Sequence, residues 1–204
     1  MLKKLSIVCF LLFSIHLSAG VVTDGSVGPR LDLPGIDYQI GADLGQQKGD
    51  NLFHSFQDFN LQNWESATFS GPGSVTNIIS RVTGGNRSKI DGVIRSTIPN
   101  ADMYFLNPYG IMFGPNARLE VMGAFHASTA DYLRFSDGKR FSTTQPNNPI
   151  LSVAPVEAFG LLTDVTHCTS KVNTRVVQNE ILLIVTDFGD TPLTPRTRVE
   201  PNII

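Results

Sequence analysis

The feature that most limits the possible folds is the spacing of short runs of β-forming residues. From Asn51 onward, brief apolar bursts alternate with clusters of Gly, Pro, Asn and Asp. Bursts that recur about every 8–12 residues are typical of all-β sandwiches, barrels and solenoids. No stretch of about a dozen residues has apolar residues at helical spacing without a Gly or Pro inside it. The pattern therefore predicts an all-β protein, and the 18 Gly and 12 Pro agree with many tight turns.

Two all-β architectures stay open on this pattern alone, a parallel β-helix and a face-packed sandwich. The bursts are short and several are apolar at adjacent positions, which suits β-helix coils stacked about 4.8 Å apart around an apolar column. No Asn-Gly or Asp-Gly pair separates two long alternating runs, as a β-hairpin prefers, and Asp91-Gly92 has strand character mainly on its far side. We therefore expect few hairpins, with either architecture possible.

Residues 1–20 have the form of a secretory signal peptide. Lys3 and Lys4 precede an apolar run over residues 5–17, which ends in Ser18-Ala19-Gly20. The run is shorter than the roughly 20 apolar residues that a spanning helix needs. We expect cleavage after Gly20 and a route through the periplasm to the cell surface or medium.

Charge and cysteine content after this cleavage exclude some classes of protein. Removing two of the 16 Lys+Arg and none of the 18 Asp+Glu leaves 14 basic and 18 acidic residues, a net charge of -4. Without a long basic run, a nucleic-acid partner is not expected. Cys168 is then the one remaining cysteine, so the fold must be held by packing and hydrogen bonds rather than by an internal disulfide.

Several ordered motifs resemble the N-terminal haemagglutination-activity, or two-partner secretion, domain of filamentous-haemagglutinin-type exoproteins. The motifs that carry the resemblance are NLFHSF (51–56), FN (59–60), ESATFS (65–70), NIISRVTGG (77–85), SKIDG (88–92), ADMYFLNP (101–108), GIMFGP (110–115) and FHASTA (125–130). Together they lie within residues 21–160. The resemblance implies a right-handed, single-stranded parallel β-helix with an extended N-terminal cap segment.

The resemblance also implies a function and its partners. The domain would direct secretion of an adhesin-like exoprotein, be recognised by an outer-membrane β-barrel transporter, and nucleate β-helix folding at the cell surface. A ligand on a host or neighbouring cell is a further partner that the family implies. No cofactor is expected.

The chain departs from the family pattern at one motif and in its last part. Tyr109 occupies a position where the family commonly has a second Asn, within Asn107-Pro108-Tyr109-Gly110-Ile111. From residue 163 onward no family pattern continues, apart from the strand-like residues 180–185. We therefore expect a signal peptide at 1–20, a secretion domain at 21–162, and an unassigned, frameshifted or truncated tail at 163–204. A genuinely short secreted protein and a non-functional gene product are the alternatives.

The resemblance places partner recognition at Asn107, Pro108, Gly110 and Ile111. A structural role explains the same residues, because Asn can bond its own turn, Pro fixes φ, and Gly accepts a positive φ. Both interpretations stay open at this point.

A sugar-active enzyme on the same fold is the main alternative in another class. It would need two carboxylates within about 5–10 Å, and the candidates are Asp91, Asp102, Asp131 and Asp137. Asp91 and Asp137 each precede Gly, which favours a turn, and we do not expect an enzyme. His54, His126 and His167 lack zinc spacing, so no metal site is expected.

The β-helix interpretation makes a quantitative prediction. Residues 51–160 should form roughly five coils of about 20 residues each. The expected core residues are Ile78, Ile90, Ile94, Phe105, Ile111, Val121 and Phe125.

Overall fold

The computed structural model describes residues 20–162 and 191–192, whose regular secondary structure consists of strands and one short 3-10 helix, η1 (Ala42–Leu44). The strands are β1 (Val21–Thr23), β2 (Asp37–Ile40), β3 (Gln46–Lys48), β4 (Asn51–Phe59), β5 (Ser66–Phe69), β6 (Asn77–Val82), β7 (Ser88–Ile90), β8 (Val93–Ser96), β9 (Asp102–Leu106), β10 (Ile111–Phe113), β11 (Arg118–Glu120), β12 (Phe125–Ser128), β13 (Tyr132–Phe135), β14 (Arg140–Ser142), β15 (Val156–Gly160) and β16 (Thr191–Pro192). Within these residues, none of the helical structure has the length and apolarity of a membrane span. The expected signal peptide, Cys168, His167 and almost all of the tail lie outside the described residues.

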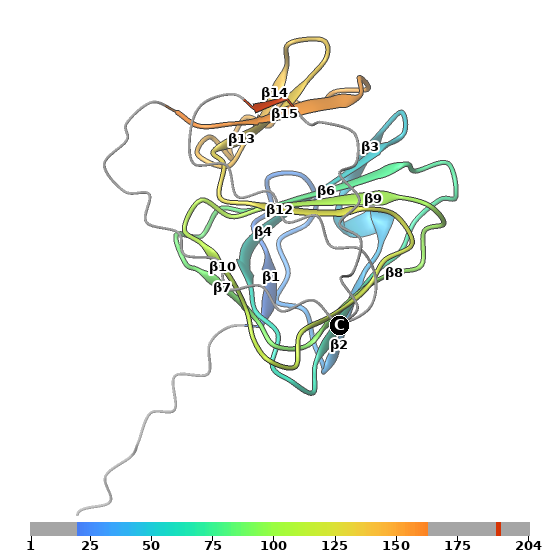
Figure 1. Cartoon of the computed structure of the whole chain (residues 1–204), viewed down its shortest axis with the longest axis vertical. Coiled ribbons are helices and arrows are strands. Elements are labelled where there is room, and N and C mark those ends of the chain that lie inside the picture. The colour runs from blue at the N-terminus through green and yellow to red at the C-terminus, as the bar shows by residue number, and fades with distance from the viewer. Residues whose placement is uncertain (1–19, 163–190, 193–204) are drawn as a thin grey trace, which may run out of the picture.

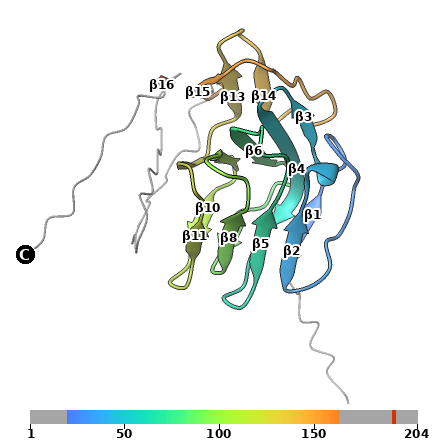
Figure 2. The same ribbon diagram turned by 90° about the vertical axis from the view of Figure 1, so that its right-hand side faces the viewer.

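Parallel strands of successive coils stack into three sides (Figure 1). The first side holds β4, β6, β9 and β12, the second holds β7 and β10, and the third holds β2, β5, β8 and β11. The third side is seen in Figure 2, with its four strands next to one another. The protein is therefore a parallel β-solenoid, as expected, and the sandwich alternative is wrong.

The coils are longer and fewer than expected. On the first side Asn51 pairs with Asn77, Asn77 with Asp102, and Met103 with Phe125, so successive coils are offset by 26, 25 and 22 residues. A coil of about 20 residues, as expected, has too few residues to form both the strands and the turns between the three sides. The stack consequently has about four turns rather than five.

The N-terminal segment caps the first coil and also contributes to it. β1 and β3 both pair antiparallel with β4, so they cover the edge that faces away from β6. This agrees with a cap, since a bare strand edge exposes unpaired backbone groups. β2 instead pairs parallel with β5, with Asp37 opposite Ser66. The solenoid thus begins at Asp37, earlier than the expected Asn51.

The expected solenoid after residue 130 is wrong, because the chain leaves the stack there. β14, β13, β15 and β16 form a separate sheet in which all neighbours are antiparallel. β13 and β14 are a hairpin across Asp137-Gly138, where Gly138 has φ +79° and its amide donates to the Phe135 carbonyl at 2.9 Å. The hairpin was not expected because its strands have only four and three residues.

The antiparallel sheet packs on the outside of the first side, which gives the molecule two apolar cores (Figure 1). We call the cluster inside the coils the inner core and the cluster between the first side and this outer sheet the outer core. First-side residues of the inner core are Leu52, Phe56, Phe59, Ile78, Val82, Met103, Phe105, Phe125 and Ala127. The outer core packs Phe53, Ile79, Tyr104 and Leu106 against Leu133, Phe135, Phe141 and Phe159. First-side strands are apolar at adjacent positions because both of their faces are covered.

Five of the seven expected core residues are fully buried in the inner core, and Ile111 and Val121 are not. These two pack against the core but stay partly exposed. Ile111 lies on β10 and Val121 directly follows β11; both strands are the last of their sheets, so no further parallel strand of the described chain covers them. Ile111 and Val121 therefore lie at the edge of the inner core rather than in its interior.

Candidate functional site

The Asn107–Ile111 motif forms the corner between the first and second sides of the third coil, after β9 and at the start of β10. The amide of Gly110 donates to the Asn107 carbonyl at 3.0 Å, which closes a four-residue turn. Asn at the first, Pro at the second and Gly at the fourth position are the preferences of a tight β-turn. The local sequence therefore specifies this corner without help from a ligand.

Asn107 is completely buried and joins three levels of the stack. Its Nδ2 donates to the Asn86 carbonyl and to Ser88 Oγ in the coil before, both at 3.0 Å. Its Oδ1 accepts from the Tyr109 amide at 3.0 Å, and its own amide donates to the Ser128 carbonyl of the following coil at 3.0 Å. Every polar group of the side chain is therefore used within the protein.

Gly110 has the positive φ that the sequence predicts, at +114°. A Cβ at this position would lie 3.3 Å from Arg87 Cγ, in addition to the backbone strain. Pro108 and Ile111 are both partly buried, and Ile111 packs against the inner core. The four expected recognition residues are thus adjacent, but none of them is highly exposed.

Two apolar side chains beside these residues face solvent instead. Tyr109 is 51% exposed and Met112, on the edge strand β10, is 51% exposed. Tyr109 is the residue that departs from the family pattern. The sequence did not predict this exposure, because it does not show which residue of the turn is buried. In the structure that residue is Asn107.

The same corner in the two earlier coils also contains asparagines, which sequence reasoning missed. Asn60 Oδ1 accepts from the Lys89 amide at 2.9 Å, and Asn86 Nδ2 donates to Asp58 Oδ1 at 2.9 Å. Each bond connects one coil to the next. The recurrence of Asn near coil-length spacing was the available signal, since short amide side chains satisfy backbone groups at corners.

The four candidate carboxylates each bond a different segment. Asp91 accepts from the Asn116 amide at 2.9 Å, and Asp102 accepts from the Ala124 amide at 2.7 Å, so both link neighbouring coils. Asp131 accepts from the Leu162 amide and Asp137 from Ser152 Oγ, each at 2.7 Å. These bonds give every carboxylate a structural role.

The two described histidines are buried and far from metal-site geometry. Burial lowers the pKa of His54 to about 4, against the opposing hydrogen bond to the Gly41 carbonyl. Burial also lowers the pKa of His126, whose ring stacks on Tyr104 with centroids 4.6 Å apart. In residues 20–162, no three His, Cys, Asp or Glu side chains are grouped to hold a metal ion.

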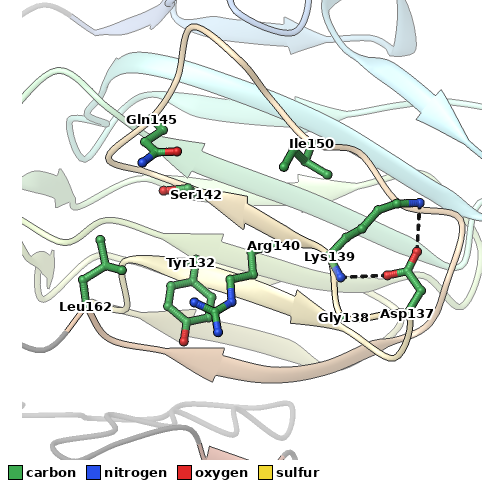
Figure 3. Close-up of a pocket in the computed structure, with 9 residues that line it drawn as sticks. All are labelled: Tyr132, Asp137, Gly138, Lys139, Arg140, Ser142, Gln145, Ile150 and Leu162. Atoms are coloured by element: carbon green, nitrogen blue, oxygen red, sulfur yellow. Dashed lines mark hydrogen bonds and ion pairs between the residues drawn. The ribbon is translucent and has the colours of Figure 1, made fainter.

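The outer sheet carries an open depression of about 490 Å³ (Figure 3). Lys139 forms an ion pair with Asp137 at 3.0 Å, and the Arg140 guanidinium lies 4.4 Å from the centre of the Tyr132 ring. Its charged groups therefore contact other side chains of the depression rather than converging on one point. No arrangement for catalysis follows from it.

Comparison with known families gives a match over most of the chain. The family described as "TPS secretion domain" matches residues 36–180, more than half of the sequence. The matched segment includes all three sides of the solenoid and the Asn107 corner. Two-partner secretion domains of filamentous-haemagglutinin-like proteins form this family, which is not a family of enzymes.

One curated protein shares a weaker similarity. The vacuolar protein sorting/targeting protein 10 of Candida albicans (strain WO-1) is 29% identical over 139 residues. These residues are 65% of this chain but only 8% of that protein. Because the match covers so little of that protein, it gives no reason to assign a sorting role to this chain.

Proposed function

The chain belongs to the TPS secretion domain family, and we propose that it is recognised directly by the periplasmic domains of one dedicated outer-membrane transporter. Membership means a secretion-targeting domain in a two-partner system, whose proteins are secreted with the help of an outer-membrane transporter. The observation that carries the proposal is the Asn107 corner, where a satisfied, buried turn holds exposed apolar side chains at the end of the solenoid.

The proposed contact residues are those that the corner presents rather than Asn107 itself. Asn107, Pro108, Gly110 and Ile111 build the corner, and their shape positions Tyr109 and Met112. Tyrosine is enriched at protein interfaces because it combines a large apolar ring with a polar tip. The buried Asn107 amide has no free group to offer a partner in the folded state.

The end of the stack offers the transporter a second kind of contact. Its strands β10, β11 and β12 are each at the end of their sheet in the described chain. Such edges can accept an added strand from another protein. We propose that the same end templates the following coils at the cell surface, in an exoprotein that acts as an adhesin.

Export would begin with residues 1–20 as a signal peptide. Gly20 packs into the domain, since its carbonyl accepts a hydrogen bond from the Asn60 amide at 2.8 Å and a Cβ there would collide with the Tyr38 ring. These contacts favour a cut after Ala19, which keeps Gly20, over the cut after Gly20 expected from sequence. N-terminal sequencing of the exported protein distinguishes the two.

Binding between the purified mature chain and the periplasmic domains of a two-partner transporter tests recognition. We expect Tyr109→Ala to weaken binding about tenfold or more at an unchanged melting temperature, as an aromatic contact residue does. Trp64→Ala is the matched control, because Trp64 is 67% exposed but lies between β4 and β5. Equal affinity of the wild type and Tyr109→Ala would contradict this contact, and no binding by the wild type would contradict the function.

A further inference from the structure

Arg81 is an unusual residue for its position in the solenoid. It lies on β6 two positions after the outer-core residue Ile79, and it has no exposed surface. Arginine is rarely buried unless its charge and its five N–H donors are engaged. Its partners come from segments that are far apart in the sequence.

One set of partners belongs to the N-terminal segment and the first coil. Arg81 Nε donates to Ser55 Oγ at 2.7 Å, and Nη2 donates to Ser26 Oγ at 2.8 Å. Asp24 accepts from Ser55 Oγ at 2.6 Å and from Thr83 Oγ1 at 2.7 Å. The network therefore connects the segment after β1 to the first two coils.

The other set of partners belongs to the outer sheet and the loop that follows β14. Arg81 Nη1 donates to the Ser142 carbonyl, and Nη2 donates to the Pro146 carbonyl at 3.1 Å. The guanidinium carbon lies 4.2 Å from the centre of the Phe141 ring. These residues follow Arg81 by 60 to 65 positions, so they are synthesised later.

Partial occupation of this site is unfavourable. A buried charge that loses one set of partners is left with donors that cannot reach water, which costs far more than a hydrogen bond normally contributes. If the outer sheet is undocked, Arg81 is instead hydrated, and its bonds to Ser26 and Ser55 compete with water. The N-terminal segment therefore gains full stabilisation only when the outer sheet is in place.

We propose that Arg81 is a latch that couples ordering of the N-terminal segment to docking of the outer sheet, so that both close in one step. The inference goes beyond the proposed function and does not depend on the transporter. It predicts that the domain does not fold by simple addition of coils from the N-terminus, as a regular repeat protein can. Closure waits for residues 141–146 to be present.

Pulse-labelled hydrogen exchange during refolding of the full chain tests the coupling without a mutation. The Asp24 amide, bonded to the Ser55 carbonyl, reports on the N-terminal segment, and the Thr143 amide, bonded to the Asp131 carbonyl, reports on the outer sheet. We expect both to become protected with rate constants within about twofold of each other. A rate constant for protection of the Asp24 amide at least about tenfold larger than that of the Thr143 amide would overturn the proposal.

Native-state exchange of Arg81→Lys tests the residue itself. Lysine keeps the charge but lacks the planar fork that reaches several acceptors at once. We expect the Asp24 and Thr143 amides to exchange about tenfold faster, with the Met103 amide of β9 changing much less. Arg140→Met is the control, because Arg140 lies in the outer sheet but stacks on Tyr132. Faster exchange at one reporter alone, or equally at all three, would overturn the proposal.

Discussion

The solenoid and the outer sheet contain similar buried side chains but are specified by different distances along the chain. Each solenoid strand pairs with the strand one coil away, 22 to 29 residues along the sequence. In the outer sheet, β13 and β14 pair across a short turn, whereas β15 pairs with β13 and β16 over 21 to 34 residues. The apolar face of this sheet meets residues of β4 such as Phe53, about 80 positions earlier. A repeating rhythm can therefore specify the solenoid, whereas the outer sheet depends on contacts that no local pattern contains.

The largest expected effect separates the two cores. Phe105 is fully buried in the inner core, with its ring centre 4.9 Å from that of Phe59. We expect Phe105→Ala to lower the free energy of unfolding by about 3–5 kcal/mol, because the stack cannot close over the cavity. Urea denaturation followed by circular dichroism measures the change.

Phe135→Ala is the matched variant in the outer core, since Phe135 is equally buried. We expect it to release the outer sheet first and leave the amides of β9 protected. If both variants deprotect β9 to the same extent, the two cores are one cooperative unit and the comparison fails.

The asparagine corner should show the next largest effect. Asn107→Ala leaves the Asn86 carbonyl and the Tyr109 amide without their partner, which should cost about 1–3 kcal/mol. Tyr109→Ala, at the same turn but exposed, should change stability by less than about 0.5 kcal/mol. Thermal melting of both variants checks the prediction, and equal melting temperatures would show that the buried bonds contribute nothing.

The solenoid should also lose stability in mild acid because of His54. Burial lowers its pKa to about 4 in the folded state, while in the unfolded chain its pKa is near the ordinary histidine value of 6.5. Unfolding therefore takes up a proton between these values, so stability is complete above pH 6.5 and falls as the pH decreases. From pH 7 to pH 5 we expect a loss of about 2 kcal/mol.

Urea midpoints at pH 7 and pH 5 measure this loss. Both pH values lie above the range in which most carboxylates titrate. His126 contributes in the same direction, because burial lowers its pKa too. His54→Gln should show a clearly smaller difference between the two pH values. An unchanged difference would exclude His54 as the cause.

The smallest effect is expected at the end of the stack. Ile111 is only partly buried, unlike Ile94 one coil earlier on the third side. Ile111→Ala should cost about 1 kcal/mol, whereas Ile94→Ala should cost about 2–5 kcal/mol. Equal losses in urea denaturation would mean that further chain covers Ile111.

Much of the inner core could be predicted from sequence, because residues that face the column recur with each burst. Ile78, Ile94 and Phe105 were expected and are buried. Coil length was underestimated, since the turn residues at the corners, such as 70–76, add to each coil without any apolar signal. The hairpin at Asp137-Gly138 was missed because its strands are short, although the Asp-Gly pair and alternating neighbours were visible.

The candidate site could be predicted only in part. The Asn-Pro-x-Gly spacing was enough to expect a turn and a positive φ at Gly110. Predicting the contacts of Asn107 with Asn86 and Ser88 would have needed the correct register between coils. The expected coil length of about 20 residues gives a different register. Arg81 was not expected to be buried, because its acceptors come from three segments that are far apart in the sequence, at Ser26, at Ser55 and at residues 142–146.

The most direct test of the secretion function is export of the full chain in Gram-negative cells that carry or lack a two-partner outer-membrane transporter from the same source. The measured quantity is the fraction of the chain in the culture medium, with a periplasmic enzyme as the leakage control. A secretion domain predicts that the chain reaches the medium only when the transporter is present and otherwise stays in the periplasm. Equal amounts in the medium with and without the transporter would contradict it.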